Sequence, residues 1–159
     1  MHGRLKENPL LNSDFRDILS AFCEEKVEFM LVGAYAVAAH GLPRATGDID
    51  LWVKRSERNA ERVCAALSKF GAPLGNITTQ DFITRDNVIQ IGVTPRRIDI
   101  LTEITGVAYE EAEKETITIE LEGMAIPVIG LTHLLQNKSA VARPQDTADV
   151  ARLEEMRNK

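Results

Sequence analysis

The sequence predicts an α+β fold in which a mixed β-sheet is flanked by helices, with further helices at the C-terminus. Helix-like and strand-like segments alternate in the first half of the chain, and pairs of strand-like segments separated by short turns follow in the second half. A chain of 159 residues, 44% of them hydrophobic, suits one domain with its own core. We therefore expect a single domain over residues 1–159, with its core at about 29–153 and a loosely packed N-terminal segment over 1–12.

In the first half of the chain, segments with the periodicity of a helix alternate with segments that have the periodicity of a strand. Apolar residues at helical spacing predict a helix over 13–26, with Asn12 or Ser13 available as its N-cap. A short apolar run over 28–32 predicts a strand that ends at Gly33, and the alanine-rich segment 34–40 predicts a short helix. Residues 48–54 alternate as a strand does, with one face formed by Ile49, Leu51 and Val53 and the other by Asp48, Asp50 and Trp52.

The second half is predicted to begin with a helix over 56–70 that ends at Gly71. Residues 72–86 give an ambiguous pattern, with a helical turn at 79–82 as the expected regular piece. Strand-like runs at 88–93 and 97–101 predict a hairpin, as do those at 116–121 and 124–129. A helical turn over 109–114 lies between the hairpins, and two helices over 131–142 and 144–157 complete the chain, the last one starting at Pro144.

Composition narrows the functional classes. A net charge of -5 argues against a wide nucleic-acid-binding face, which needs clustered Lys and Arg, but it leaves room for a local pocket for one nucleotide. The two cysteines, Cys23 and Cys64, form neither a disulfide framework nor a metal-ligand spacing. The N-terminal segment lacks the apolar region of a signal peptide, and no apolar run reaches the length of a membrane span. We expect a cytoplasmic protein that does not contact a membrane.

The Asp-Ile-Asp sequence at 48–50 is the first candidate for chemistry. Carboxylates at positions i and i+2 of a strand project from the same face, with their Cβ atoms about 6–7 Å apart. That separation suits two oxygen ligands of a shared Mg²⁺ ion, whereas two adjacent carboxylates without a cation repel each other. By itself this motif is common, because strands at a sheet edge often carry solvated carboxylates.

A third acid strengthens the interpretation. Asp99 lies between Ile98 and Ile100 on another predicted strand and therefore faces away from their core side. If the two strands are neighbours, three carboxylates meet at one place, which is typical of phosphoryl or nucleotidyl transfer. Gly33, between a strand and a helix, would allow a phosphate to approach the backbone N–H groups closely.

These residues resemble the signature of the DNA polymerase beta-like nucleotidyltransferase superfamily, in which a Gly and a small residue precede two acids that flank one apolar residue. The matching residues here are Gly33-Ala34 and, after a spacer, Asp48-Ile49-Asp50-Leu51. The run from Arg44 to Leu51 is similar to that of small nucleotidyltransferases grouped with AbiEii-like toxin proteins, as is the segment 134–149. The resemblance covers roughly residues 29–153, but Ala34 replaces the usual Gly or Ser.

The resemblance implies a nucleotidyltransferase fold and a role for each matching residue. Mg²⁺, or Mn²⁺ in its place, would be bound by Asp48, Asp50 and Asp99, with Asp99 also acting as the general base. The nucleoside triphosphate would be contacted by Gly33, Ala34, Arg44 and Lys138, where the Lys138 ammonium would neutralise phosphate charge. For Arg44 and Lys138, a solvated surface role remains an equally open interpretation. Arg96 and Arg97, next to Asp99, are expected to pair with carboxylates at the sheet edge.

The leading hypothesis is an enzyme that transfers a nucleoside monophosphate from ATP or another triphosphate to an acceptor hydroxyl. The acceptor stays open between a protein, a tRNA end and a small molecule, and a partner protein or a second copy in a homodimer would complete the site of so short a chain. The alternative is a non-catalytic module, either a nucleotide-binding sensor or an interaction partner in a toxin–antitoxin pair, that keeps the fold without turnover. The Ala34 departure favours this alternative, and the presence of all three acids opposes it.

Overall fold

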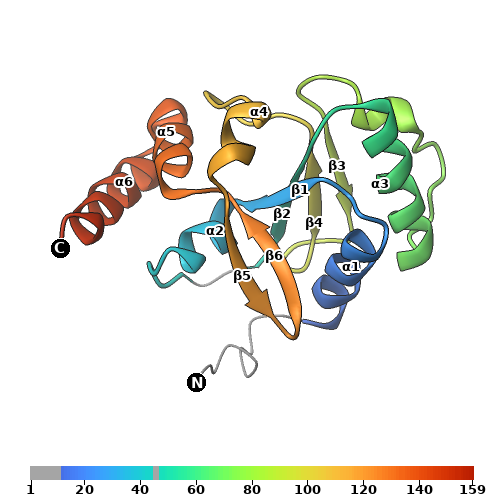
Figure 1. Cartoon of the computed structure of the whole chain (residues 1–159), viewed down its shortest axis with the longest axis horizontal. Coiled ribbons are helices and arrows are strands. Elements are labelled where there is room, and N and C mark those ends of the chain that lie inside the picture. Colours follow the sequence, from blue (N-terminus) through green and yellow to red (C-terminus); the bar gives the residue numbers. More distant parts are fainter. Residues whose placement is uncertain (1–11, 45–46) are drawn as a thin grey trace.

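The structure, a computed structural model, describes residues 12–44 and 47–159 and contains one six-stranded mixed sheet with the strand order β3-β4-β2-β1-β6-β5 (Figure 1). β1 runs antiparallel to β2 and parallel to β6, and β2 runs parallel to β4. The two hairpins, β3–β4 and β5–β6, form the two edges of the sheet. The strands are β1 (Phe29–Val32), β2 (Ile49–Val53), β3 (Val88–Ile91), β4 (Ile98–Leu101), β5 (Ile117–Leu121) and β6 (Met124–Val128).

The helices begin and end close to where the sequence predicts. The Asn12 side chain accepts a hydrogen bond from the N–H of Phe15 at 2.9 Å and caps α1, and Gly71, with a φ of 94°, ends α3. The helices are α1 (Ser13–Glu24), α2 (Gly33–Ala39), α3 (Glu57–Phe70), α4 (Tyr109–Ala112), α5 (Leu131–Val141) and α6 (Pro144–Arg157), with 3₁₀ turns at Thr79–Phe82 and Glu113–Glu115. The predicted α+β fold class is therefore confirmed.

One part of the core lies between the sheet and the two helices α1 and α3, which pack side by side (Figure 1), and the buried cluster continues on the other face of the sheet around Met30 and Trp52. Five apolar side chains of α1 are buried, so the core includes a segment that lies before the predicted start at residue 29; they are Phe15, Ile18, Leu19, Ala21 and Phe22. Phe22 meets Phe29 edge to face at a centroid distance of 5.1 Å. The N-terminal segment 1–11, predicted to be loosely packed, lies outside the described residues.

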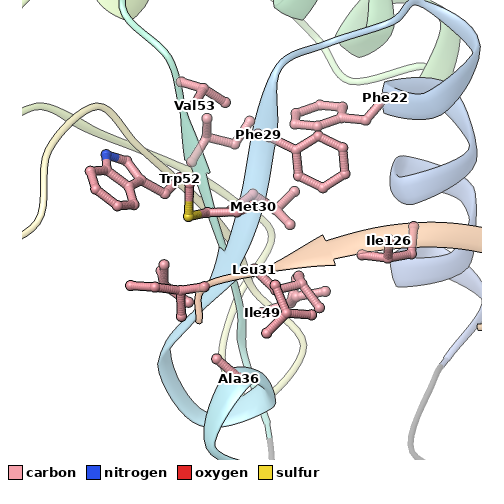
Figure 2. Close-up of a cluster of buried hydrophobic side chains, with 14 of the residues drawn as sticks. Phe22, Phe29, Met30, Leu31, Ala36, Ile49, Trp52, Val53 and Ile126 are labelled. Atoms are coloured by element: carbon pink, nitrogen blue, oxygen red, sulfur yellow. The ribbon is translucent and has the colours of Figure 1, made fainter. Parts of the chain in front are cut away.

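The other side of β1 and β2 carries α2, α5 and α6 in Figure 1. Trp52 points to this side, opposite Phe22 and Phe29 (Figure 2), and it packs against Tyr109 of α4. The strand therefore alternates as predicted, with Ile49, Leu51 and Val53 buried on the core side. Over the residues that the structure describes, no helix is both long enough and apolar enough to cross a membrane.

Candidate functional site

The site is built on the central parallel pair of strands. In the register of β2 and β4, Asp50 lies directly opposite Asp99, and Ile49 and Leu51 lie opposite Ile98 and Ile100. Residues opposite each other on neighbouring strands point to the same face of a sheet, so the carboxyl groups of Asp50 and Asp99 lie side by side. The sequence left open whether these two strands are neighbours, and the structure shows that they are. We call Asp48, Asp50 and Asp99 the acid site.

Gly33 forms the floor beneath one of these acids. Its φ of 72° belongs to the left-handed region that favours glycine, at the point where β1 becomes α2. A Cβ atom at this position would lie 2.1 Å from Oδ2 of Asp50. Because Val32 is paired with Asp50 across the antiparallel strands, the Asp50 carboxyl group lies directly against the Gly33 backbone. Glycine is therefore required here for its backbone angle and for the space that Asp50 fills.

Arg97 is the cation that balances the acid site. Its Nε donates to Oδ1 of Asp99 at 2.7 Å and its Nη2 donates to Oδ2 at 3.1 Å, which makes a bidentate ion pair. Its backbone N–H donates to Oδ1 of Asp48 at 2.9 Å, while Nη2 lies 3.4 Å from Oδ2 of Asp48. The Thr94 hydroxyl donates to the same Asp48 oxygen at 3.0 Å. The expected pairing of Arg97 with carboxylates is thus present, and one guanidinium serves two of the three acids.

Asp50 is the acid that this arrangement leaves uncompensated. Burial, followed by the negative charges of Asp99 and Asp48, raises the pKa of Asp50 from 3.8 to about 7, and Arg97 offsets only part of this rise. A buried carboxyl group that is hydrogen-bonded to a second carboxyl group and has a raised pKa is a candidate for a functional site.

The chemistry of these donors fits a hard divalent cation, because Mg²⁺ prefers carboxylate oxygens. Within residues 12–44 and 47–159, however, no three His, Cys, Asp or Glu side chains are arranged as a ready ligand set. In this arrangement Arg97 pairs with the carboxylates of both Asp48 and Asp99. The ligand set Asp48, Asp50 and Asp99 therefore remains a prediction. The types of donor fit Mg²⁺, but Arg97 would have to release Asp48 and Asp99 before they could bind the ion.

Two cations predicted to contact phosphates lie in a second group of charges. Lys138 of α5 is 7% exposed, and its Nζ lies 3.0 Å from Asp146 and 3.0 Å from Asp149, both on α6. The Arg44 guanidinium donates to Asp149, and Nε of Arg143 donates to Asp146 at 2.6 Å. We call these five residues the helix ion cluster. Ala45 and Thr46, which follow Arg44 in the resemblance to the AbiEii-like group, lie outside the described residues.

In the helix ion cluster, both carboxylates are paired with cations. Hydrogen bonds from Arg143 and Lys138 hold the pKa of Asp146 well below its usual range. Burial acts to raise the pKa of Asp149, but Arg44 and Lys138 outweigh it, so this pKa is also lowered. The sequence analysis did not predict this cluster. The available signal was the i, i+3 spacing of Asp146 and Asp149, which places two carboxylates on one helix face.

Comparison with protein-family models gave no match, and neither did comparison with curated proteins. Comparison with solved structures did find similar folds. One is the crystal structure of a protein from Thermotoga maritima described as a "putative nucleotidyltransferase", which is 18% identical and matches over 90% of this chain and 89% of that chain with a TM-score of 0.56. At this identity the similarity establishes the fold, so the chain has a nucleotidyltransferase fold, as the resemblance of its motifs implied.

Proposed function

We propose that the protein is a metal-dependent nucleotidyltransferase, which transfers a nucleoside monophosphate from a triphosphate to an acceptor hydroxyl and releases pyrophosphate. The observation that carries this proposal is the pair of opposed carboxyl groups, Asp50 and Asp99, seated beside the Gly33 turn. The nucleotidyltransferase fold supports the same reaction class. The raised pKa of Asp50 supports the proposal, because a bound cation beside this carboxyl group would favour its charged form.

The roles follow from the contacts of each residue. Asp48, Asp50 and Asp99 would hold Mg²⁺ or Mn²⁺, which would supply charge stabilisation for the phosphate oxygens. Asp99, a hydrogen-bond acceptor on its strand, would take the proton of the acceptor hydroxyl. Gly33 and Ala34 present the first backbone N–H groups of α2 beside Asp50, where the triphosphate would be bound.

Arg44 and Lys138 enter the proposal as phosphate ligands only if they leave the helix ion cluster. Both contact Asp149, and Lys138 is buried, so a triphosphate would have to compete with carboxylates that already satisfy them. Arg97 is placed differently, because it touches two members of the acid site and is partly exposed. We therefore propose Arg97 as an additional cation facing the nucleotide.

Two observations favour the non-catalytic alternative. Arg97 already bridges Asp48 and Asp99, as a structural ion pair would, and Ala34 lacks the hydroxyl found in the signature. On this view the protein is a nucleotide sensor or an interaction module of a toxin–antitoxin pair. In either case the partner, whether a protein, a tRNA, a small molecule or a second copy of this chain, would approach the same face of the sheet.

The test has two stages. Calorimetry with ATP, GTP, CTP and UTP, with and without Mg²⁺, measures nucleotide binding; incubation with α-labelled triphosphates and cell extract then measures transfer. Label in RNA, protein or a small molecule supports the enzyme if it is lost in Asp50→Asn and retained in the matched control Asp17→Asn, at an exposed residue of α1. Mg²⁺-dependent binding without labelled product would indicate the sensor, and neither binding nor transfer would indicate the interaction module.

A further inference from the structure

The turn between β3 and β4 places a hydroxyl group at the acid site. Thr94 lies in this turn, and its hydroxyl donates to Oδ2 of Asp48 at 3.0 Å. Nη1 of Arg97 donates to the same Thr94 oxygen at 3.1 Å. By contrast, the hydroxyls of Thr84 and Thr102 donate to backbone carbonyl groups. Thr94 therefore directs both its hydroxyl hydrogen and an oxygen lone pair at charged groups of the acid site.

Contacts with the segment that leads into β2 hold this turn in place. The N–H of Ile49 donates to the carbonyl oxygen of Arg97 at 3.0 Å. Gly47 leaves room for the turn, since a Cβ atom there would lie 3.1 Å from the carbonyl oxygen of Pro95. The turn that carries Thr94 is thus packed against the residues that carry the first acid of the site.

Asp48 has the contacts of a base that is oriented toward Thr94. One carboxylate oxygen of Asp48 accepts from the Thr94 hydroxyl, while the other accepts the backbone N–H of Arg97 at 2.9 Å. A hydroxyl paired with a base, which is in turn oriented by a third group, is the arrangement of an activated nucleophile. Thr94 is exposed and the Asp48 side chain is 21% exposed, so a bound substrate can reach this pair.

We propose that Thr94 is a site of self-nucleotidylation, so that the chain itself supplies an acceptor hydroxyl. Oγ1 of Thr94 forms a bond to the α-phosphorus of a nucleoside triphosphate, and the bond from this phosphorus to the oxygen bridging to the β-phosphorus breaks. Pyrophosphate leaves with that electron pair, the hydroxyl proton passes to Asp48, and Thr94 carries the nucleotide as a phosphodiester. The lone pair that Arg97 holds becomes free when Arg97 releases the acid site, as the proposed function requires. This inference rests on the proposed function and names one acceptor for it.

The test uses the purified full chain, Mg²⁺ and each of the four α-labelled triphosphates, without cell extract. We expect the intact mass of the chain to rise by one nucleotidyl group, and fragmentation to place this group on Thr94. A γ-labelled triphosphate should leave the chain unlabelled, because its label departs with pyrophosphate. Label on another residue, or an unlabelled chain beside labelled acceptors in extract, overturns the inference and leaves the proposed function standing. If neither the chain nor the extract is labelled, both fail.

Two substitutions of Thr94 separate the hydroxyl from the shape of the side chain. Thr94→Val removes the hydroxyl at similar volume and is expected to lose the label, whereas Thr94→Ser keeps a hydroxyl and is expected to retain it. Thr118→Val is the matched control at an exposed threonine of β5, on the other edge of the sheet, and should be labelled as the wild type is. Thermal unfolding checks that each variant folds. Equal labelling of Thr94→Val and the wild type overturns the inference, and the mapped residue of the wild type decides it if Thr94→Val fails to fold.

Discussion

The acid site and the helix ion cluster are both built from aspartates and cationic side chains, but they differ in how many cations compensate the carboxylates. In the helix ion cluster, Asp146 and Asp149 have three cations between them, and their pKa values are lowered. In the acid site, three carboxylates share Arg97 alone among the described cations that pair with them, and the pKa of Asp50 rises to about 7. Both groups include buried aspartates, so burial alone does not separate them.

The difference indicates what each group is for. Charges that are matched within the chain stabilise the packing of α5 on α6 and the position of Arg44. Charges that remain unmatched cost stability, and they persist where a ligand or a metal supplies the balance. The comparison therefore predicts opposite effects for substitutions in the two groups.

Removing the central cation of the helix ion cluster should have the largest effect. Lys138→Met leaves Asp146 and Asp149 buried with less compensation, and breaking such a buried pair lowers the free energy of unfolding by about 3–5 kcal/mol. Denaturant unfolding measures the change. Lys114→Met, at a lysine whose side chain is 68% exposed, is the matched control and should stay within about 0.5 kcal/mol. A loss below about 1 kcal/mol in Lys138→Met would show that the cluster is not the stabilising group described here.

Filling the floor of the acid site should have the next largest effect. In Gly33→Ala the new Cβ would meet Oδ2 of Asp50, and the backbone would keep an unfavourable φ, for a total loss of roughly 2–4 kcal/mol. Gly71→Ala isolates the backbone component, because φ is 94° there and no described atom lies within 4 Å of the added Cβ.

A double-mutant cycle sharpens this prediction. Asp50→Ala removes the carboxyl atoms that the new methyl group in Gly33→Ala would meet. The loss of unfolding free energy caused by Gly33→Ala should therefore shrink toward that of Gly71→Ala. Additive losses in the double variant would contradict a direct contact between residues 33 and 50.

Neutralising the uncompensated acid should stabilise the metal-free protein. Between pH 4 and 7 the unfolded chain releases the proton of Asp50 while the folded chain keeps it, so the stability of the wild type falls as the pH rises. Relative to the wild type, Asp50→Asn should gain roughly 1–3 kcal/mol at pH 8, below the ceiling of about 4 kcal/mol for a shift of this size, and almost nothing at pH 4. Unfolding curves in EDTA at several pH values measure the gain.

The helix ion cluster should titrate with the opposite sign. A lowered pKa means that the stability contributed by Asp146 is present above about pH 4 and is lost as the pH falls further. Asp146→Asn should therefore be less stable than the wild type at neutral pH, and this difference should narrow in acid. A stability gain in Asp146→Asn at neutral pH would remove the contrast between the two groups.

The sequence predicted the acid site better than the helix ion cluster, for a physical reason. Strand periodicity assigned Asp50 and Trp52 to one face and Ile49 and Leu51 to the other, because a strand repeats every two residues whatever surrounds it. The same rule places Arg97 and Asp99 on one face, as their hydrogen bonds confirm. That β2 and β4 are neighbours is a tertiary fact, which periodicity alone did not supply.

The helix ion cluster depends on tertiary contacts throughout. Lys138 meets Asp146 and Asp149 only because α5 and α6 pack against each other across a short turn, and Arg44 reaches the cluster from the segment after α2. A charged residue within a helical pattern is more often exposed, so nothing in the local sequence marks Lys138 as buried. The predicted core began only at about residue 29 for a similar reason. The amphipathic pattern of α1 shows that one of its faces is buried, but it does not show which sheet that face covers.

Adding Mg²⁺ should give the smallest effect and the most specific one. Mg²⁺ at about ten times its dissociation constant raises the free energy of unfolding by about 1.4 kcal/mol, which corresponds to roughly 3–6 °C in Tm for a chain of this size. The rise should vanish in Asp50→Asn and persist in Asp17→Asn. Sodium chloride at the same ionic strength controls for screening, since screened repulsion between Asp50 and Asp99 would raise Tm without any bound ion. An equal rise in Asp50→Asn and the wild type would place the cation elsewhere, and the acid site would then be balanced by Arg97 alone.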